Sequence, residues 1–145
     1  VSNIFIPNKT LRDKVSLEIR KTGYSQLNTM GLIAGQVAYE EGGQWVRELN
    51  KYLNNNLDFV REFISNHLPN VRLIEPEGTY LLWLDFRELG LTQDNLEDLL
   101  SNKARIWLNS GIIFGEEGLG FMRLNIACPI SVLESALNRL KDVIK

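Results

Sequence analysis

Apolar residues recur at the spacing of α-helices through the first half of the chain. The pattern predicts a helix that ends near Lys21, a second that ends near Glu41, and a third from Trp45 to Leu68. Capping or helix-breaking residues mark the boundaries: Asn8 or Thr10, Gly23, Asn28 or Thr29, Gly42-Gly43 and Pro69. The third helix would extend for about seven turns, which is more than a small core requires.

The pattern changes to that of a sheet after Pro69. Residues 71–74 and 79–86 are predicted strands, and the second is apolar enough for a central strand covered on both faces. A short helix is expected over 92–102, and an S-x-x-E capping box, Ser131 and Glu134, starts a last helix. Three smaller features are expected: a strand-like segment at 3–6, a turn at 110–111 between short apolar segments, and a mobile loop at 115–118.

Residues 120–129 show the clearest alternation of a β-strand. One face would carry Phe121, Arg123, Asn125 and Ala127, and the other Met122, Leu124, Ile126 and Cys128. The second set is wholly apolar and is expected in a core. From about Gly43 onward the elements predict an α+β fold, an α/β sandwich in which an open sheet has helices on one side.

The composition is that of an ordinary globular protein, with 44% hydrophobic and 23% charged residues in a chain of 145. A net charge of −2 argues against a nucleic-acid partner. No apolar run is long enough to span a membrane, and no basic and apolar leader precedes Ser2, so no membrane association is expected. A single cysteine, Cys128, excludes an internal disulfide and predicts a reducing, cytoplasmic location.

Few side chains are candidates for chemistry. Cys128 is interpreted as a small buried hydrophobe in preference to a nucleophile, because the only histidine, His67, has no visible partner. The same scarcity argues against a metal site. Arg123 has two interpretations: a planar fork that binds a carboxylate or phosphate, or an arginine that pairs with one of the chain's own acids or reaches solvent. The alternation alone favours the second.

Four stretches resemble, in order along the chain, the fold-type I pyridoxal-phosphate enzymes of the class I/II aminotransferase family. The most similar branch is that of the cystathionine β-lyase-like C–S lyases. The stretches are Ser2-Asn3-Ile4-Phe5-Ile6-Pro7-Asn8, Ala38–Trp45 with Tyr52-Leu53 and Asn56 after it, Pro76–Phe86, and Gly120-Phe121-Met122-Arg123-Leu124-Asn125-Ile126-Ala127-Cys128-Pro129. One departure is Ile130, where such relatives often carry arginine.

The resemblance implies that the chain is the C-terminal part of such an enzyme. Residues 1–41 would be the tail of the large, cofactor-binding domain, 42–68 a long linking helix, and 69–145 the small C-terminal domain. Pyridoxal 5′-phosphate in the full-length enzyme, an amino-acid substrate and a homodimer are implied as well. Arg123 would bind the substrate α-carboxylate, and Asn125 is a further candidate for substrate binding.

The resemblance also implies that the Schiff-base lysine precedes Val1. No catalytic residue, cofactor-binding residue or bound cofactor is therefore expected in this chain, which alone is predicted to be inactive. The parent reaction would be a C–S β-elimination of a cystathionine or cysteine type, or a transamination; the resemblance favours the first, and the residues do not decide. The alternative from another class is a stand-alone, non-catalytic module that dimerises or binds an anion through Arg123.

Overall fold

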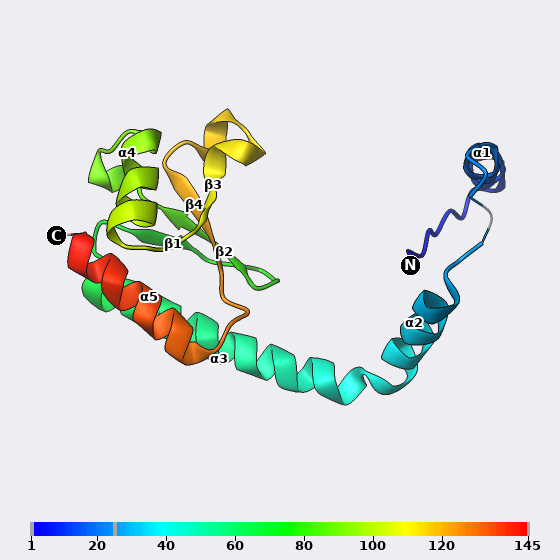
Figure 1. The fold of residues 1–145 in the computed structure, drawn as a ribbon, viewed down its shortest axis with the longest axis horizontal. Coiled ribbons are helices and arrows are strands. Elements are labelled where there is room, and N and C mark those ends of the chain that lie inside the picture. The colour runs from blue at the N-terminus through cyan, green and yellow to red at the C-terminus, as the bar shows by residue number, and fades with distance from the viewer. Residues whose placement is uncertain (1, 25, 145) are drawn as a thin grey trace. The chain divides into compact units, whose positions relative to one another are not determined.

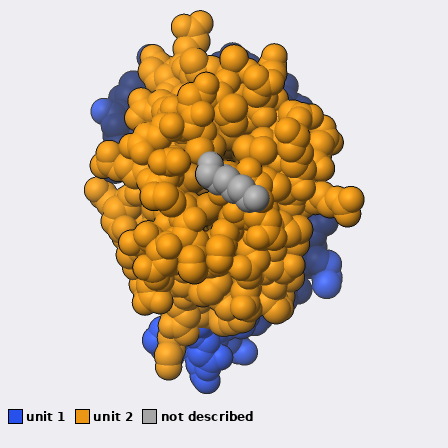
Figure 2. Space-filling view, turned by 90° about the vertical axis from the view of Figure 1, so that its left-hand side faces the viewer, with its two compact units in different colours: residues 1–48 blue, residues 49–145 orange. Residues whose placement is uncertain are grey.

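The computed structural model describes residues 2–24 and 26–144 and divides into two compact units, residues 1–48 and 49–145 (Figure 2). The long helix α3, Gly43–His67, confirms the predicted third helix. The boundary between the two units falls inside it. Each unit is described by itself. The assignment of residues 1–41, 42–68 and 69–145 to parts of a larger enzyme stays a prediction.

The first unit holds the two helices expected at the start of the chain, α1, Lys9–Lys21, and α2, Thr29–Glu41 (Figure 1). Each begins at an asparagine whose side-chain oxygen accepts a hydrogen bond from the third residue along, at 3.0 Å in both helices. These bonds satisfy a backbone N–H that the first helical turn leaves without a partner. The caps are therefore Asn8 and Asn28, and neither helix contains a buried residue.

The segment at residues 3–6 is not a strand, so that prediction is wrong. A strand needs a neighbour to complete its ladder of hydrogen bonds, and the sheet of the described chain lies wholly in the second unit. The segment is instead held by a side chain, because Arg12 Nη1 in α1 donates to the Ile6 carbonyl at 2.9 Å.

The second unit is built on a four-stranded antiparallel sheet with the order β1-β2-β4-β3. Its strands are β1, Arg72–Ile74; β2, Leu81–Asp85; β3, Asn109–Ser110; and β4, Phe121–Asn125 (Figure 1). The helices are the second part of α3, then α4, Gln93–Asp98, which continues as a π-helical turn over Leu99–Lys103, and α5, Ile130–Val143.

A single hydrophobic core joins the helices to one face of this sheet. The sheet contributes Leu82, Leu84, Met122 and Leu124, which are all buried. The helices contribute Val60 and Ile64 from α3, Leu96 and Leu100 from the α4 region, and Leu133, Leu137 and Leu140 from α5. Because these side chains pack into one cluster, the structure confirms the predicted α+β arrangement with helices on one side of an open sheet.

The central position of β2 is confirmed, but its coverage on both faces is not. Leu82 and Leu84 point into the core, whereas Leu81 and Trp83, which alternate with them, are only half-buried. The helices of this unit share one core on one face, and on the other face Trp83 contacts the rings of Phe114 and Phe121. The near-continuous apolar run therefore reflects a half-covered strand with aromatic neighbours.

The segment between α4 and β4 also differs from the prediction. A turn was expected at residues 110–111, but Ser110 forms the short edge strand β3 with Asn109, and 3₁₀ turns follow over Gly111–Phe114 and Glu116–Gly118. A Cβ on Gly111 would lie 2.2 Å from the Gly118 carbonyl oxygen, and a Cβ on Gly118 would lie 2.1 Å from that of Gly111. The expected mobile loop is thus a compact turn in which Gly118 is buried.

Helix α5 begins without the predicted capping box. Ser131 and Glu134 lie inside the helix, and no side chain caps its start at Pro129. The Ile130 N–H instead donates to the Tyr52 hydroxyl of α3 at 2.9 Å, so a tertiary contact satisfies that N–H. The helix itself is confirmed, and its apolar residues Leu133, Leu137 and Leu140, at helical spacing, are buried.

Candidate functional site

The strand that carries Arg123 has the alternation predicted from the sequence. Met122 and Leu124 are buried, Arg123 is half-buried and Asn125 is exposed. The cross-strand partners of Arg123 are Trp83 on β2 and Asn109 on β3. Residues opposite each other in antiparallel strands share a face of the sheet, so these three side chains belong to the face away from the helical core.

The guanidinium of Arg123 is held by two neighbours. Its Nη2 donates to Asn109 Oδ1 at 3.0 Å, and its central carbon lies 4.8 Å from the ring centroid of Phe114. A guanidinium near an aromatic ring is attracted to the negative charge of the π face. The Nε of Arg123 is buried and has no hydrogen-bond partner among the described residues. The inner end of the fork is therefore enclosed, while the outer end carries the remaining donors.

No carboxylate in the described part of the chain forms a salt bridge with Arg123. The second arginine on this face is different: Arg87 Nε and Nη2 donate to the two carboxylate oxygens of Asp85, at 2.9 and 2.7 Å. The hydrogen bonds from Arg87 hold the pKa of Asp85 below its usual value. The chain thus neutralises Arg87 internally and leaves the charge of Arg123 without an acidic partner in this region.

Aromatic rings form a wall beside Arg123. Trp83 stacks on Phe121 with ring centroids 5.6 Å apart, and it meets Phe114 edge to face at 5.5 Å. Arg87 covers the other part of the wall, 4.6 Å from the Phe121 centroid. Apolar walls lower the local dielectric and strengthen the attraction of Arg123 for an anion. An anionic group that reaches this face would therefore find one cation beside an aromatic surface.

A buried glutamine, which the sequence analysis did not single out, connects the elements behind the site. Gln93 Nε2 donates to Ser110 Oγ at 2.8 Å and to Glu97 Oε1 at 2.9 Å, and Gln93 Oε1 accepts from the Gly120 N–H at 2.9 Å. These bonds join α4 to β3 and to the residue before β4. The hydrogen bonds from Ser110 and Gln93 also hold the pKa of Glu97 below its usual value. Only tertiary structure could identify Gln93, because a lone glutamine has no sequence signature.

The chain beyond β4 is fixed to α3. Asn56, which is 1% exposed, donates from Nδ2 to the Ile126 carbonyl at 2.8 Å and to the Cys128 carbonyl at 3.0 Å. Asn125, the second candidate residue, is exposed, and its Oδ1 accepts from the Ala127 N–H at 2.8 Å. That bond is an Asx turn, which ends the strand. It gives Asn125 a structural explanation, and its role in substrate binding stays a prediction.

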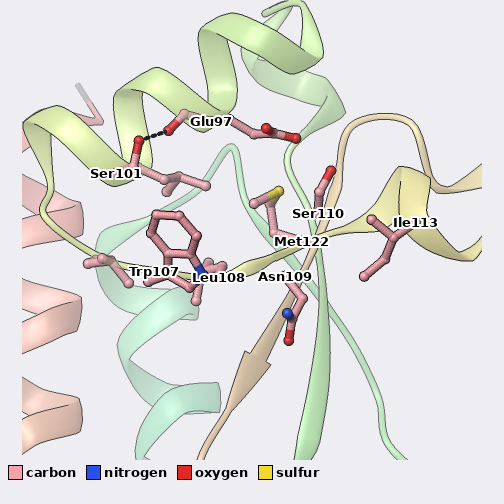
Figure 3. Close-up of a pocket in the computed structure, with 10 residues that line it drawn as sticks. Glu97, Ser101, Trp107, Leu108, Asn109, Ser110, Ile113 and Met122 are labelled. Atoms are coloured by element: carbon pink, nitrogen blue, oxygen red, sulfur yellow. Dashed lines mark hydrogen bonds between the residues drawn. The ribbon is translucent and has the colours of Figure 1, made fainter.

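A small cavity of about 230 Å³ lies next to β3, on the side of α4 (Figure 3). Glu97, Ser110, Met122 and the largely exposed Trp107 line it. Figure 3 shows the Asn109 amide turned away from the side chains of Ser110 and Met122, as expected for neighbouring positions on a strand. Asn109, which accepts the hydrogen bond from Arg123, is also one of the residues that line the cavity.

The remaining candidates do not assemble into a site in the described chain. Cys128 is half-buried, and burial raises the pKa of its thiol, which disfavours the thiolate that a nucleophile requires. His67 packs edge to face on Phe63, with ring centroids 4.8 Å apart. The described residues contain no cluster of His, Cys, Asp and Glu that could hold a metal ion. No helix among them is both long and apolar enough to cross a membrane.

Comparisons with known proteins agree with the resemblance seen in the sequence. No protein-family model matches the chain. It is 36% identical over 140 residues to the cystathionine β-lyase PatB of Bacillus subtilis, an alignment of 97% of this chain and 36% of PatB. Further relatives include an aspartate aminotransferase and an aromatic-amino-acid aminotransferase. The chain thus spans about a third of the length of the curated relatives it matches.

Solved structures give the same result. Cystalysin from Treponema denticola, whose crystal contains a pyridoxal 5′-phosphate cofactor, matches with a TM-score of 0.92 and 34% identity, over 98% of this chain and 36% of cystalysin. The PLP-bound C–S lyase from Staphylococcus hominis matches with a TM-score of 0.80 and 27% identity, over 98% of this chain and 37% of the lyase. These findings do not favour a stand-alone module. The chain is therefore a homologue of cystathionine β-lyases and has the fold of pyridoxal-phosphate-dependent enzymes, and the match is consistent with a C-terminal part of such a protein.

Proposed function

We propose that the chain forms the C-terminal third of a pyridoxal-phosphate-dependent C–S lyase, which cleaves the Cβ–S bond of a sulfur-containing amino acid. Arg123 binds the α-carboxylate of that substrate. The proposal is supported by the relatives, which include a cystathionine β-lyase and C–S lyases. Transamination of an amino acid is the second candidate, because aminotransferases are also among the relatives.

The observation that carries the proposal is the state of Arg123. A half-buried guanidinium without an acidic partner among the described residues is unusual, because burying a charge is costly unless it is paired. Its outer donors match the two oxygens of a carboxylate, which accept parallel hydrogen bonds. Holding the carboxylate fixes one end of the substrate and orients the Cα–H bond for removal of the proton. This positioning contribution is the one we assign to the described residues.

The described chain does not fit the covalent attachment of the cofactor. That attachment needs a lysine in an enclosed site, and every described lysine is exposed: Lys9, Lys14, Lys21, Lys51, Lys103 and Lys141. When bound in a complete enzyme, pyridoxal phosphate supplies an electron sink for the substrate carbanion. We therefore assign no step through the cofactor to these residues. The homodimer and the cytoplasmic location stay predictions of the resemblance and of the single cysteine.

The test is Arg123→Lys in the complete enzyme that carries this chain. Lysine keeps the charge but loses the planar fork, and a hydrogen bond to a charged group is worth ~1.5–3 kcal/mol. We expect kcat/KM for the amino-acid substrate to fall by about one to two orders of magnitude, with cofactor binding little changed. Pyruvate and ammonia as products identify elimination, whereas a 2-oxo acid that retains the substrate's side chain identifies transamination. A variant that unfolds while its folded fraction keeps normal kcat/KM would show that Arg123 is only structural.

A further inference from the structure

We propose that Asn109 is a positioning residue for substrate recognition: its neutral amide fixes the Arg123 guanidinium without neutralising it. The inference rests on the proposed function and extends it to a residue that the sequence analysis did not single out. Asn109 lies on the edge strand β3, directly opposite Arg123 in the register of the sheet. Its position therefore depends on the backbone, and the geometry of the pair follows from the strand pairing.

The orientation of the Asn109 amide is determined by its partner. A guanidinium only donates hydrogen bonds, so the side-chain oxygen of Asn109 must be the atom that faces Arg123 Nη2, at 3.0 Å. Phe114 lies over the guanidinium at 4.8 Å, and the Nε end is enclosed. The amide, the aromatic ring and the enclosed Nε together restrict the side chain to one orientation. Among the residues that the structure describes, Arg123 Nη1 has no hydrogen-bond partner, so it stays available to a ligand.

The neutrality of Asn109 distinguishes this pair from the other arginine pair on the same face. Asp85 binds Arg87 with a carboxylate and cancels its charge, as the lowered pKa of Asp85 reflects. An aspartate at position 109 would do the same to Arg123. It would also repel a substrate carboxylate across a few ångströms, where the interaction of like charges is substantial. An amide provides the hydrogen bond for positioning and leaves the positive charge available.

The backbone at position 109 is held by contacts of the residues that follow it, and these contacts do not involve the Asn109 side chain. Ser110, the next residue, receives the hydrogen bond from buried Gln93, and Gly111 packs against Gly118. These contacts hold the backbone of β3 even when the side chain at position 109 changes. Substitutions of Asn109 are therefore expected to alter the orientation and charge of the Arg123 site without unfolding the sheet.

The experiment compares Asn109→Asp, Asn109→Ala and Arg123→Lys in the complete enzyme, with Asn70→Asp in an exposed turn as the charge-matched control. We expect Asn109→Asp to raise KM for the amino acid by about tenfold or more, with a smaller change in kcat. Asn109→Ala should raise KM by about three- to tenfold, since it loses a single hydrogen bond. Binding of an amine analogue that lacks the α-carboxylate should change less than twofold (about the error of the assay) in both variants.

A merely structural role gives a different pattern. The carboxylate introduced by Asn109→Asp would retain the hydrogen bond and add an ion pair, so this variant would then keep KM within about twofold of wild type and match or exceed its melting temperature. That result, combined with a loss of affinity in Arg123→Lys, would overturn the positioning role and leave the proposed function standing. Normal kinetics in Arg123→Lys would overturn both. Equal losses for the substrate and for the analogue without a carboxylate would also overturn the inference.

Discussion

The buried Asn56 allows a direct test of how the Arg123 strand is anchored. Asn54, Asn55 and Asn56 follow one another on α3, yet only Asn56 is buried. Its side-chain amide donates to the carbonyls of Ile126 and Cys128, just beyond β4. Asn56→Ala removes both hydrogen bonds, and Asn55→Ala makes the same chemical change on an exposed part of the same helix. The difference between the two variants therefore reports the tertiary bonds alone.

The magnitude follows from the burial of each acceptor. The bond to Ile126 is buried, and leaving a buried carbonyl without a donor costs about 1–3 kcal/mol. The bond to Cys128 is partly buried, and its loss costs about 0.5–1.5 kcal/mol because water replaces the amide in part. We expect Asn56→Ala to lower the free energy of unfolding by about 2–4 kcal/mol, and Asn55→Ala to change it by less than about 0.5 kcal/mol.

Urea unfolding monitored by tryptophan fluorescence measures both variants. Trp83 lies in the sheet of the second unit, and a background with the exposed Trp45 and Trp107 replaced by phenylalanine restricts the signal to that sheet. The urea concentration at the midpoint of unfolding should be lower in Asn56→Ala than in wild type, while the slope of the unfolding free energy against urea concentration stays unchanged. Equal midpoints for Asn56→Ala and Asn55→Ala would refute the reasoning, since the two hydrogen bonds would then contribute nothing to stability.

Two further predictions concern stability in the same unit. Gly118→Ala directs a methyl group at the Gly111 carbonyl oxygen, 2.1 Å away, and should lower the free energy of unfolding in urea by about 1–3 kcal/mol. The control is Gly78→Ala, which has no atom within 4 Å of its Cβ and should change that free energy by less than about 0.5 kcal/mol. Equal effects of the two variants would contradict the observed packing. The lowered pKa of Asp85 means that its pairing with Arg87 stabilises the fold above the unfolded carboxyl pKa of about 3.9 and is lost as pH falls through the lower folded pKa. Unfolding free energies measured from pH 2 to 7 should therefore fall less steeply at acid pH in Asp85→Asn than in wild type, and identical slopes would count against the pair.

Local patterns accounted for most of the helices and for the faces of the Arg123 strand. Asn8 and Asn28, each one of two predicted candidates, cap their helices, because a cap depends on a side chain and the backbone three residues away. The alternation of β4 placed Arg123 on one face of the strand and the buried Met122 and Leu124 on the other face, because a strand has a period of two. These features depend on neighbours in the sequence, so the sequence by itself determines them.

Contacts between distant residues decided the rest. The start of α5 uses the Tyr52 hydroxyl, 78 residues away, and so the local capping box at Ser131 was not needed. The short strand β3 exists because Asn109 and Ser110 pair with β4, and this pairing brings Asn109 to Arg123. A pattern within a short window carries no information about which distant group supplies a hydrogen bond. The sequence therefore predicted Arg123 as a candidate site residue, and only the tertiary structure showed its neutral partner, Asn109.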